Sequence, residues 1–342
     1  MLVSRGCSIS EMSFRPTTKF GFATQNMTYF TYSREAILDI LEVNHIGEDD
    51  EIVLPNYLCS TVIESILPVT KKIIFYDINS HLMHKQSDIT KLLTDKTKLI
   101  MFVDYFGVET QLERSLQVQL ENQDIIVVKD SAHAFLSVVN NSFHKNYNYD
   151  YLITSVYKNL PFQAGSIAIG NFGQRADFVS LYIVLKRFAV LAIKNTICIL
   201  GLQRFFTEKV CEMSISNAIK INRSNGFNIA SLYKAILFRI DWVRVAAEKK
   251  VLTQQFNSFF FGRPTFRPIF TREQIEMNVL QDYPLYFDSQ TERDRMWKLL
   301  IDNSIDAYTW PTFHRINCND KLWNKVLVLP LNKKVLKVLQ SV

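Results

Sequence analysis

Lys158 and Asp130 are the two residues whose types and order could do chemistry together. Lys158 enters a turn after a strand predicted over 150–155, and Asp130 lies just past a strand predicted over 124–129. A lysine amine can form an imine with an aldehyde, and a carboxylate can pair with a protonated pyridine nitrogen so that the ring withdraws electrons. An enzyme that holds pyridoxal phosphate needs a carboxylate after one strand and then a lysine after a later strand. Neither residue alone would indicate such an enzyme.

The position of Asp130 favours a functional carboxylate. The strand before it is a short run of β-branched residues, typical of a parallel strand buried on both faces. Open α/β sheets bind ligands outside the carboxyl ends of such strands, whereas a helix N-cap aspartate would look similar in sequence. His133, three residues on, could lie over a cofactor ring or hydrogen-bond its hydroxyl, and a histidine filling a polar corner is the alternative.

A phosphate site is predicted at Ser33 and Arg34, which open a helical pattern through Ala36, Ile37 and Ile40. Helix N-termini gather unpaired N–H groups and a partial positive charge, so a hydroxyl and an arginine there make an anion cup. Ordinary capping of the helix by Ser33 is the alternative, and the serine could do both.

Seven short segments then occur in a fixed order along the chain. They are SREA (33–36), DEIVLP (50–55), FYDI (75–78), TKLI (97–100), YFG (105–107), DSAHA (130–134) and SVYKNLP (155–161). In this order they resemble the DegT/StrS-type sugar aminotransferase family, of pyridoxal-phosphate fold type I. The likeness runs from about Phe30 to Gly170 and resumes in the tail at 283–286, 291–303, 310–311 and 328–331.

The resemblance implies an α/β fold, in which helices sandwich a mostly parallel central sheet as in aspartate aminotransferase, with a small α+β carboxy-terminal domain. It implies that Lys158 is the Schiff-base lysine and Asp130 the pyridinium partner, with Ser155, Ser33 and Arg34 on the phosphate of pyridoxal 5'-phosphate. Ser155 precedes Lys158 by three residues, whereas the family commonly spaces its serine by five. This departure affects the expected substrate more than the cofactor.

Ring packing on the cofactor is a second departure from the family. Cys59 falls near the place where many relatives stack an aromatic ring, which leaves His133 or Tyr57 to supply that contact. The resemblance also implies a homodimer, with the partner subunit contacting the cofactor near 222–223 or Asn228, although Arg223 could be a solvated loop charge. Candidate residues for the substrate pocket are Trp310, His314 and Arg315.

The activity implied by the resemblance is transamination in two half-reactions. The amino group, from glutamate by family analogy, would pass to a nucleotide-linked keto-sugar for surface polysaccharide or glycoconjugate biosynthesis. A sugar dehydratase is one alternative, but relatives with that chemistry typically replace the lysine with histidine. A catalytically silent binding or assembly component is another, and the joint presence of Lys158, Asp130 and Ser155 argues against it.

Composition indicates a globular protein. The chain has 342 residues, of which 48% are hydrophobic and ten are glycine, and it can form a large domain over 1–228 and a small one over 229–342. The net charge of +6 comes without a basic run that interleaves aromatics, so no nucleic-acid partner is expected. Five scattered cysteines without a CxxC pair indicate a reducing compartment and no structural metal. The first residues lack the apolar stretch of a signal peptide, so a cytoplasmic location is expected.

Two long helical segments complete the prediction. Residues 178–206 are very apolar, but Lys186, Arg187 and Lys194 interrupt them, and central cations are unfavourable in a bilayer. We expect amphipathic helices here, packed on the large domain or at a dimer interface, with peripheral membrane contact as the less favoured alternative. A second helix is predicted over 229–257, leading into the small domain.

Overall fold

The computed structural model describes residues 27–139, 149–159, 164–173, 177–199, 227–262, 266–311 and 320–341. A seven-stranded sheet organises the first part of the chain, in the order β1-β7-β6-β5-β4-β2-β3. Its strands are β1 (Met27–Phe30), β2 (Glu51–Pro55), β3 (Ile73–Tyr76), β4 (Thr97–Val103), β5 (Ile126–Ser131), β6 (Tyr151–Ser155) and β7 (Ser166–Ile169). The five neighbouring strands β3, β2, β4, β5 and β6 run parallel. Strand β7 is antiparallel to both its neighbours, so the sheet is mostly parallel, as predicted.

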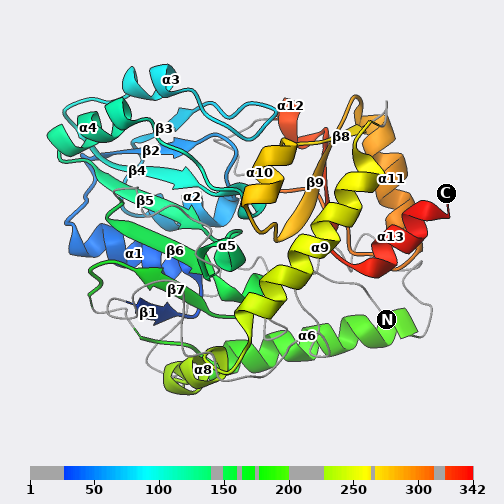
Figure 1. Ribbon diagram of the computed structural model, residues 1–342. Helices are drawn as coiled ribbons and strands as arrows, with labels where there is room; N and C mark the ends of the chain where they lie inside the picture. Colours follow the sequence, from blue (N-terminus) through cyan, green and yellow to red (C-terminus); the bar gives the residue numbers. More distant parts are fainter. Residues whose placement is uncertain are drawn as a thin grey trace.

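Helices cover the sheet on both faces (Figure 1). Those that follow the strands are α1 (Ser33–Val43), α2 (Ser60–Ile66), α3 (Gln86–Thr90), α4 (Arg114–Asn122), α5 (Phe135–Val139) and α6 (Leu181–Ile199). Successive strand residues point to opposite faces, so Phe30 and Ala168 belong to one buried cluster with α1, whereas Tyr29 and Ile167 belong to a second with α5. The alternation of strands and helices therefore produces the layered α/β fold that the sequence predicts.

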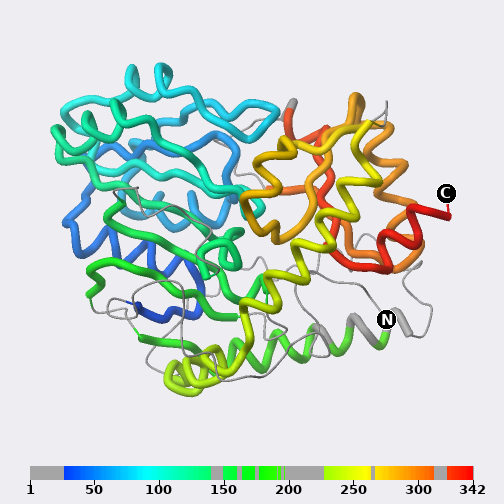
Figure 2. Tube along the Cα trace, viewed as in Figure 1, coloured from blue at the N-terminus to red at the C-terminus, as the bar shows by residue number. Residues whose placement is uncertain are grey.

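A smaller unit follows the sheet and contains its own antiparallel sheet, in the order β10-β9-β8. Its elements are β8 (Phe266–Pro268), α10 (Arg272–Met277), β9 (Asp282–Phe287), α11 (Gln290–Asp302), α12 (Asp320–Trp323), β10 (Val326–Pro330) and α13 (Lys333–Gln340). The small α+β unit is thus present, and Figure 2 shows the later part of the chain packed beside the blue-to-green large unit. The division at residue 228 stays a prediction.

The two units meet at a tight turn after β4, the 3-10 turn η3 (Tyr105–Gly107). Gly107 adopts φ +106°, and a Cβ there would collide with the carbonyl oxygen of Val279. The Gln281 N–H donates to the Phe106 carbonyl at 2.9 Å, and the Ser137 hydroxyl donates to the Gly107 carbonyl at 2.8 Å. The backbone of the small unit therefore touches the strand end from which the candidate site is built.

The single helix predicted over 229–257 is wrong, because two helices occupy the segment: α8 (Ala230–Leu237) and α9 (Trp242–Phe260). Asp241 caps α9 by accepting from the Arg244 N–H. The indole N–H of Trp242 donates to the Leu237 carbonyl at 2.9 Å, and both side chains are buried. The cap at Asp241 and the Trp242–Leu237 contact mark the place where one helix ends and the next begins.

Helix α6 is continuous over Leu181–Ile199, and residues 200–206 lie outside the described part. Ile183 and Val184 near its start are buried in the second cluster, whereas Tyr182 and Leu185 are 62% and 58% exposed. In the part of the chain that the structure describes, no helix combines the length and apolarity of a membrane span.

Candidate active site

Asp130 lies in β5 and not after it. The strand begins and ends two residues later than predicted, because the Asp130 backbone is paired with both β4 and β6, opposite Val103 and Ile153. Its Oδ1 accepts from the Ala132 N–H at 2.9 Å, and α5 starts only at Phe135, so the helix N-cap alternative is wrong. The side chain nevertheless sits at the carboxyl end of the strand, as a ligand-binding carboxylate should.

Lys158 ends the 3-10 turn η4 (Val156–Lys158) that directly follows β6. The Tyr157 N–H donates to the Gly165 carbonyl at 3.2 Å, and the Gly165 N–H donates to the Thr31 carbonyl at 2.8 Å. Gly165 has φ +107° and lies against the Tyr233 ring, so a larger residue would collide there. The turn that carries the lysine is therefore held through Gly165, which hydrogen-bonds to Thr31 just after β1 and lies against Tyr233 of α8.

The structure brings Asp130 and Lys158 together. Burial raises the pKa of the Asp130 carboxyl, whereas the nearby Lys158 charge and the Ala132 N–H lower that pKa. Asp130 is 8% exposed and Lys158 is half-buried, so the pair lies at the margin of the core rather than within it. An amine and a carboxylate thus share one end of the sheet, which is the arrangement expected from the sequence.

Ser33 and Ser155 form a hydroxyl pair, with their Oγ atoms 2.5 Å apart although they are 122 residues apart in sequence. The Ser33 hydroxyl also donates to the Thr154 carbonyl at 3.3 Å. The N-cap position of α1 is Tyr32, without a side-chain cap, so the alternative that Ser33 simply caps the helix is wrong. Two predicted phosphate-binding residues therefore meet at the N-terminus of an 11-residue helix.

Arg34 directly follows Ser33 in the chain, and its guanidinium carbon lies 4.4 Å from the centroid of the Tyr32 ring. Arg187 of α6 lies 5.1 Å from the same centroid and 5.1 Å from that of Tyr157. Burial raises the pKa of the Tyr32 hydroxyl, whereas the nearby Arg187 and Arg34 guanidinium groups lower it. The sequence indicated Arg34 but not the approach of α6.

His133 packs among aromatic rings. It stacks on Phe106 at 5.0 Å and meets Trp310 edge-on at 4.7 Å, both between ring centroids. Tyr57 lies 5.3 Å from Trp310 and donates its hydroxyl to the Trp310 carbonyl. The three residues His133, Tyr57 and Trp310, separate predictions from the sequence, therefore belong to one aromatic cluster.

The contacts of the remaining candidate residues say less about their roles in the site. The half-buried Cys59 precedes α2, and its Sγ lies 3.3 Å from the Thr61 hydroxyl. The Asn228 side chain accepts from the Val179 N–H at 3.1 Å and donates to the Asp177 carbonyl at 2.8 Å, so it ties loops within one subunit. His314, Arg315 and 222–223 lie outside the described residues.

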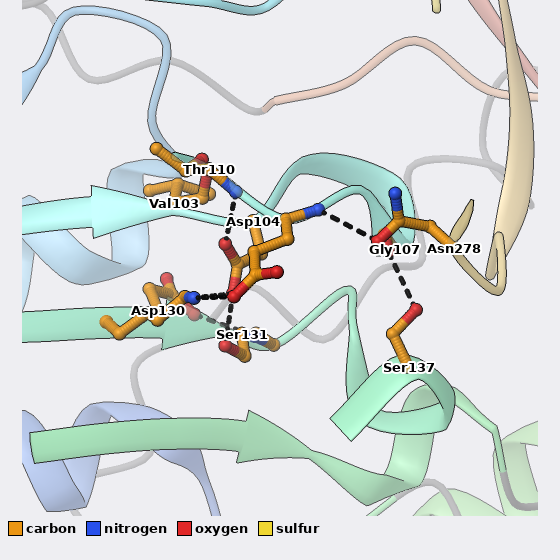
Figure 3. Close-up of polar contacts among 11 residues, drawn as sticks. Val103, Asp104, Gly107, Thr110, Asp130, Ser131, Ser137 and Asn278 are labelled. Carbon is orange, nitrogen blue, oxygen red and sulfur yellow. Dashed lines mark hydrogen bonds and ion pairs between the residues drawn. The ribbon is translucent and has the colours of Figure 1, made fainter. Parts of the chain in front are cut away.

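Next to Asp130 lies a buried charge network that the sequence did not predict, and Figure 3 shows its Asp104 close to Ser131. The Lys129 Nζ is 2.9 Å from the Glu109 Oε1 and 3.8 Å from the Asp104 Oδ2, and all three side chains are at most 6% exposed. Asp104 also accepts from the Ser131 hydroxyl and, at 2.8 Å, from the Thr110 N–H. These contacts link the ends of β4 and β5.

One signal in the sequence could have revealed this network. Lys129 ends a run of β-branched residues that reads as a fully buried strand, and lysine is almost never buried without a partner. The nearby acidic residues are Asp104 and Glu109. Burial raises the Asp104 pKa to about 6, against the lowering effects of Lys129, the Ser131 hydroxyl and the Thr110 N–H.

Comparison with known proteins confirms the resemblance. Residues 21–157 match the model of the DegT/DnrJ/EryC1/StrS aminotransferase family, a stretch that includes Asp130 and ends one residue before Lys158. A relative from Shewanella sediminis (strain HAW-EB3), a UDP-4-amino-4-deoxy-L-arabinose--oxoglutarate aminotransferase, is 32% identical over 96 residues. That segment is 28% of this chain and 24% of the relative, so the match spans about a quarter of the relative's length.

Solved structures share the fold over nearly the whole chain. Spr1654 of Streptococcus pneumoniae in its PLP form has a TM-score of 0.62 at 17% identity, covering 96% of this chain and 91% of that one. Helicobacter pylori PseC, an aminotransferase involved in the biosynthesis of pseudoaminic acid, has a TM-score of 0.60 at 16% identity, covering 92% and 87%. The two units are thus those of an aminotransferase fold.

Proposed function

We propose that the protein is a pyridoxal-phosphate-dependent aminotransferase that transfers an amino group from glutamate to a nucleotide-linked keto-sugar. The observation that carries the proposal is the meeting of three groups at one end of the sheet: the Asp130 carboxyl, the Lys158 amine and the Ser33–Ser155 hydroxyl pair. The family match over 21–157 supports the reaction class. The names of the relatives support a sugar acceptor.

The residues present fit the cofactor by their chemistry. Ser33 and Ser155 supply hydroxyls at a helix N-terminus for the phosphate, and Arg34 supplies a charge beside them. Asp130 supplies the carboxylate for the pyridinium nitrogen, and His133, held by Phe106 and Trp310, supplies a ring for the cofactor to pack against. Tyr57 supports that ring through Trp310, and Cys59 adds only a thiol at the start of α2.

When bound, pyridoxal phosphate would supply an aldehyde for Lys158 and an electron-withdrawing ring. The Lys158 amine would hold the cofactor, and the same amine would move a proton at the substrate α-carbon. Asp130 would favour a protonated pyridine nitrogen, because a negative charge stabilises a nearby cation. Retention of the lysine at the end of η4 argues against the dehydratase alternative.

The direct test is spectroscopic. Purified protein incubated with pyridoxal phosphate is expected to absorb in the near-visible, and borohydride reduction should fix the cofactor on the peptide that contains Lys158. Mass spectrometry locates the modified residue, and Lys158→Ala is the control that should lose the label. Label on a different lysine, or a wild-type protein without the band, would contradict the proposal. Activity with glutamate and a panel of nucleotide-linked keto-sugars then tests donor and acceptor.

The assembly proposed is a cytoplasmic homodimer that serves surface polysaccharide or glycoconjugate biosynthesis. Four exposed apolar side chains support a covered face near α6 and α8: Tyr182, Leu185, Phe227 and Leu232, which are 57% to 74% exposed. Sedimentation in detergent-free buffer is expected to give a dimer. A fully active monomer would exclude this arrangement, and flotation with anionic liposomes would favour the peripheral membrane alternative.

A further inference from the structure

Asp104, which directly follows β4, contacts the end of β5 twice. Its N–H donates to the Asp130 carbonyl at 2.9 Å, and its carboxylate Oδ2 accepts from the Ser131 hydroxyl. Figure 3 shows Asp104 between Ser131 and Thr110, whose N–H donates to the other carboxylate oxygen at 2.8 Å. Asp104 therefore holds the end of β5 by its main chain and its side chain together.

The same end of β5 sets the direction of the Asp130 carboxyl. The Asp130 Oδ1 accepts from the Ala132 N–H at 2.9 Å. The peptide that carries this N–H joins Ser131 to Ala132, and because a peptide is planar, its carbonyl and its N–H turn together. The carbonyl of that peptide, on Ser131, accepts from the Ala134 N–H at 2.8 Å. A shift of Ser131 would therefore turn the N–H that holds the Asp130 carboxyl.

Lys129 and Glu109 add buried charge to this arrangement, on the face of β5 opposite to Asp130. Successive side chains of a strand point to opposite faces, so Lys129 and Ser131 share one face and Asp130 belongs to the other. The Lys129 Nζ lies 3.8 Å from the Asp104 Oδ2 and 2.9 Å from the Glu109 Oε1. Buried charges are costly to desolvate, and apolar side chains of similar volume often stabilise a core at least as well. The network therefore suits a role in fixing geometry better than a role in stability alone.

We propose that Asp104 is a positioning residue, which acts through Ser131 to aim the Asp130 carboxyl at the ring nitrogen of the cofactor. This inference rests on the proposed function, in which Asp130 pairs with that nitrogen. Asp104 is fully buried and its two oxygens accept from Thr110 and Ser131, so the proposal assigns it no contact with a ligand and no proton transfer. Loss of the Ser131 contact is expected to leave the Asp130 carboxyl present but poorly aimed.

The experiment isolates the ring nitrogen by comparing two ligands. Dissociation constants are measured by calorimetry for pyridoxal 5'-phosphate and for its deaza analogue, in which a C–H group replaces the ring nitrogen. Both ligands carry the same aldehyde and phosphate, so the constant of the analogue divided by that of pyridoxal 5'-phosphate reports the contact with Asp130. Asp130→Asn should lower this ratio about tenfold, because a charge-assisted hydrogen bond is lost.

Ser131→Ala and Ser137→Ala are a matched pair of variants. Each removes one hydroxyl from a fully buried serine, but only Ser131 donates to Asp104, whereas the Ser137 hydroxyl donates to the Gly107 carbonyl at 2.8 Å. Ser131→Ala is expected to lower the ratio about threefold or more, and Ser137→Ala should keep the wild-type ratio. Asp104→Asn should follow Ser131→Ala, because an amide cannot accept from a donor on each side. Ser131→Thr keeps the hydroxyl and should restore the ratio.

Unchanged ratios in Ser131→Ala and Asp104→Asn, or an equal decrease in Ser137→Ala, would overturn the proposal, because a general loss of packing weakens both ligands alike. In either case Asp130→Asn would still lower the ratio, so the proposed function would stand. A wild-type protein that binds both ligands equally, or neither, would refute the pyridinium role of Asp130 and the positioning role with it. If Asp104→Asn has a collapsed circular dichroism spectrum, Ser131→Ala decides, since it leaves every buried charge in place.

Discussion

The two sides of the candidate site are built in different ways. On the β5 side, Asp130 lies in a strand paired on both edges and directly follows Lys129, which is buried with Asp104 and Glu109. On the β6 side, Ser33 meets Ser155 across 122 residues of chain. The first side is fixed by neighbouring strands, whereas the second depends on segments from several parts of the fold. The difference suggests that substitutions on the β5 side should affect stability most and those on the β6 side ligand binding.

Lys158→Ala should give the largest effect and tests the β6 side. Turnover is expected to fall by at least about 10⁴-fold, because one side chain serves as both anchor and proton carrier. The urea midpoint should stay close to that of wild type, since the half-buried side chain adds little to the core. Steady-state kinetics and urea unfolding check both parts, and an active variant would refute the assignment of the lysine.

Lys129→Met tests the β5 side through stability. The substitution leaves two buried carboxylates, Asp104 and Glu109, without their cation, and breaking a buried ion pair destabilises by about 3–5 kcal/mol. Lys72→Met is the matched control, because Lys72 pairs with Asp49 at 2.7 Å on the surface. That exposed pair should contribute less than about 1 kcal/mol. Similar urea midpoints for the two variants would remove the contrast between the two sides.

Asp130→Asn is on the β5 side but is expected to act on turnover, because the Asp130 carboxyl lies near the Lys158 charge. The variant should still bind some pyridoxal phosphate, but turnover is expected to drop about 100-fold or more, because the neutral amide no longer favours a protonated pyridine nitrogen. Kinetics together with cofactor titration separate the two effects. Unchanged turnover would place the pyridinium partner at a different residue.

The smallest expected effect is a pH dependence of stability. Burial raises the Asp104 pKa from 3.8 to about 6, so the folded protein binds that proton more readily than the unfolded chain. The contribution of Asp104 to stability is therefore greatest at low pH and is lost as the pH rises through that window. His84 acts in the opposite sense, because burial lowers its pKa from 6.5 to about 4 and its contribution is lost as the pH falls.

Asp104→Asn separates these opposing contributions. The free energy of unfolding of wild type minus that of the variant should decrease as the pH rises from 4 to 7, because only wild type carries the titrating carboxyl. Urea unfolding at a series of pH values measures the difference. A difference that stays constant, or increases with pH, would show that the Asp104 pKa is not raised.

Local patterns predicted the parallel strands and the lysine turn, because β-branched runs and strand-end positions are properties of neighbouring residues. They misplaced the ends of β5, since ladder pairing with β4 and β6 decides where that strand stops. The break between α8 and α9 depends on the joint burial of Leu237 and Trp242. The approach of Arg187 to Tyr32 depends on contacts between distant segments, which no local pattern contains.

The pairing of β1 has a consequence for the order of synthesis. This first strand of the described chain pairs in the sheet with β7, so β1 has no strand partner until the chain has been made through Ile169. Contacts this distant in sequence form late, because the intervening chain must first be ordered. A nascent chain that ends before β7 can already contain Asp130 and Lys158, but Ser33 has no fixed place beside Ser155. The predicted phosphate cup of Ser33 and Ser155 is therefore expected to be complete only once β7 is available, so cofactor capture is expected late in the folding of that unit.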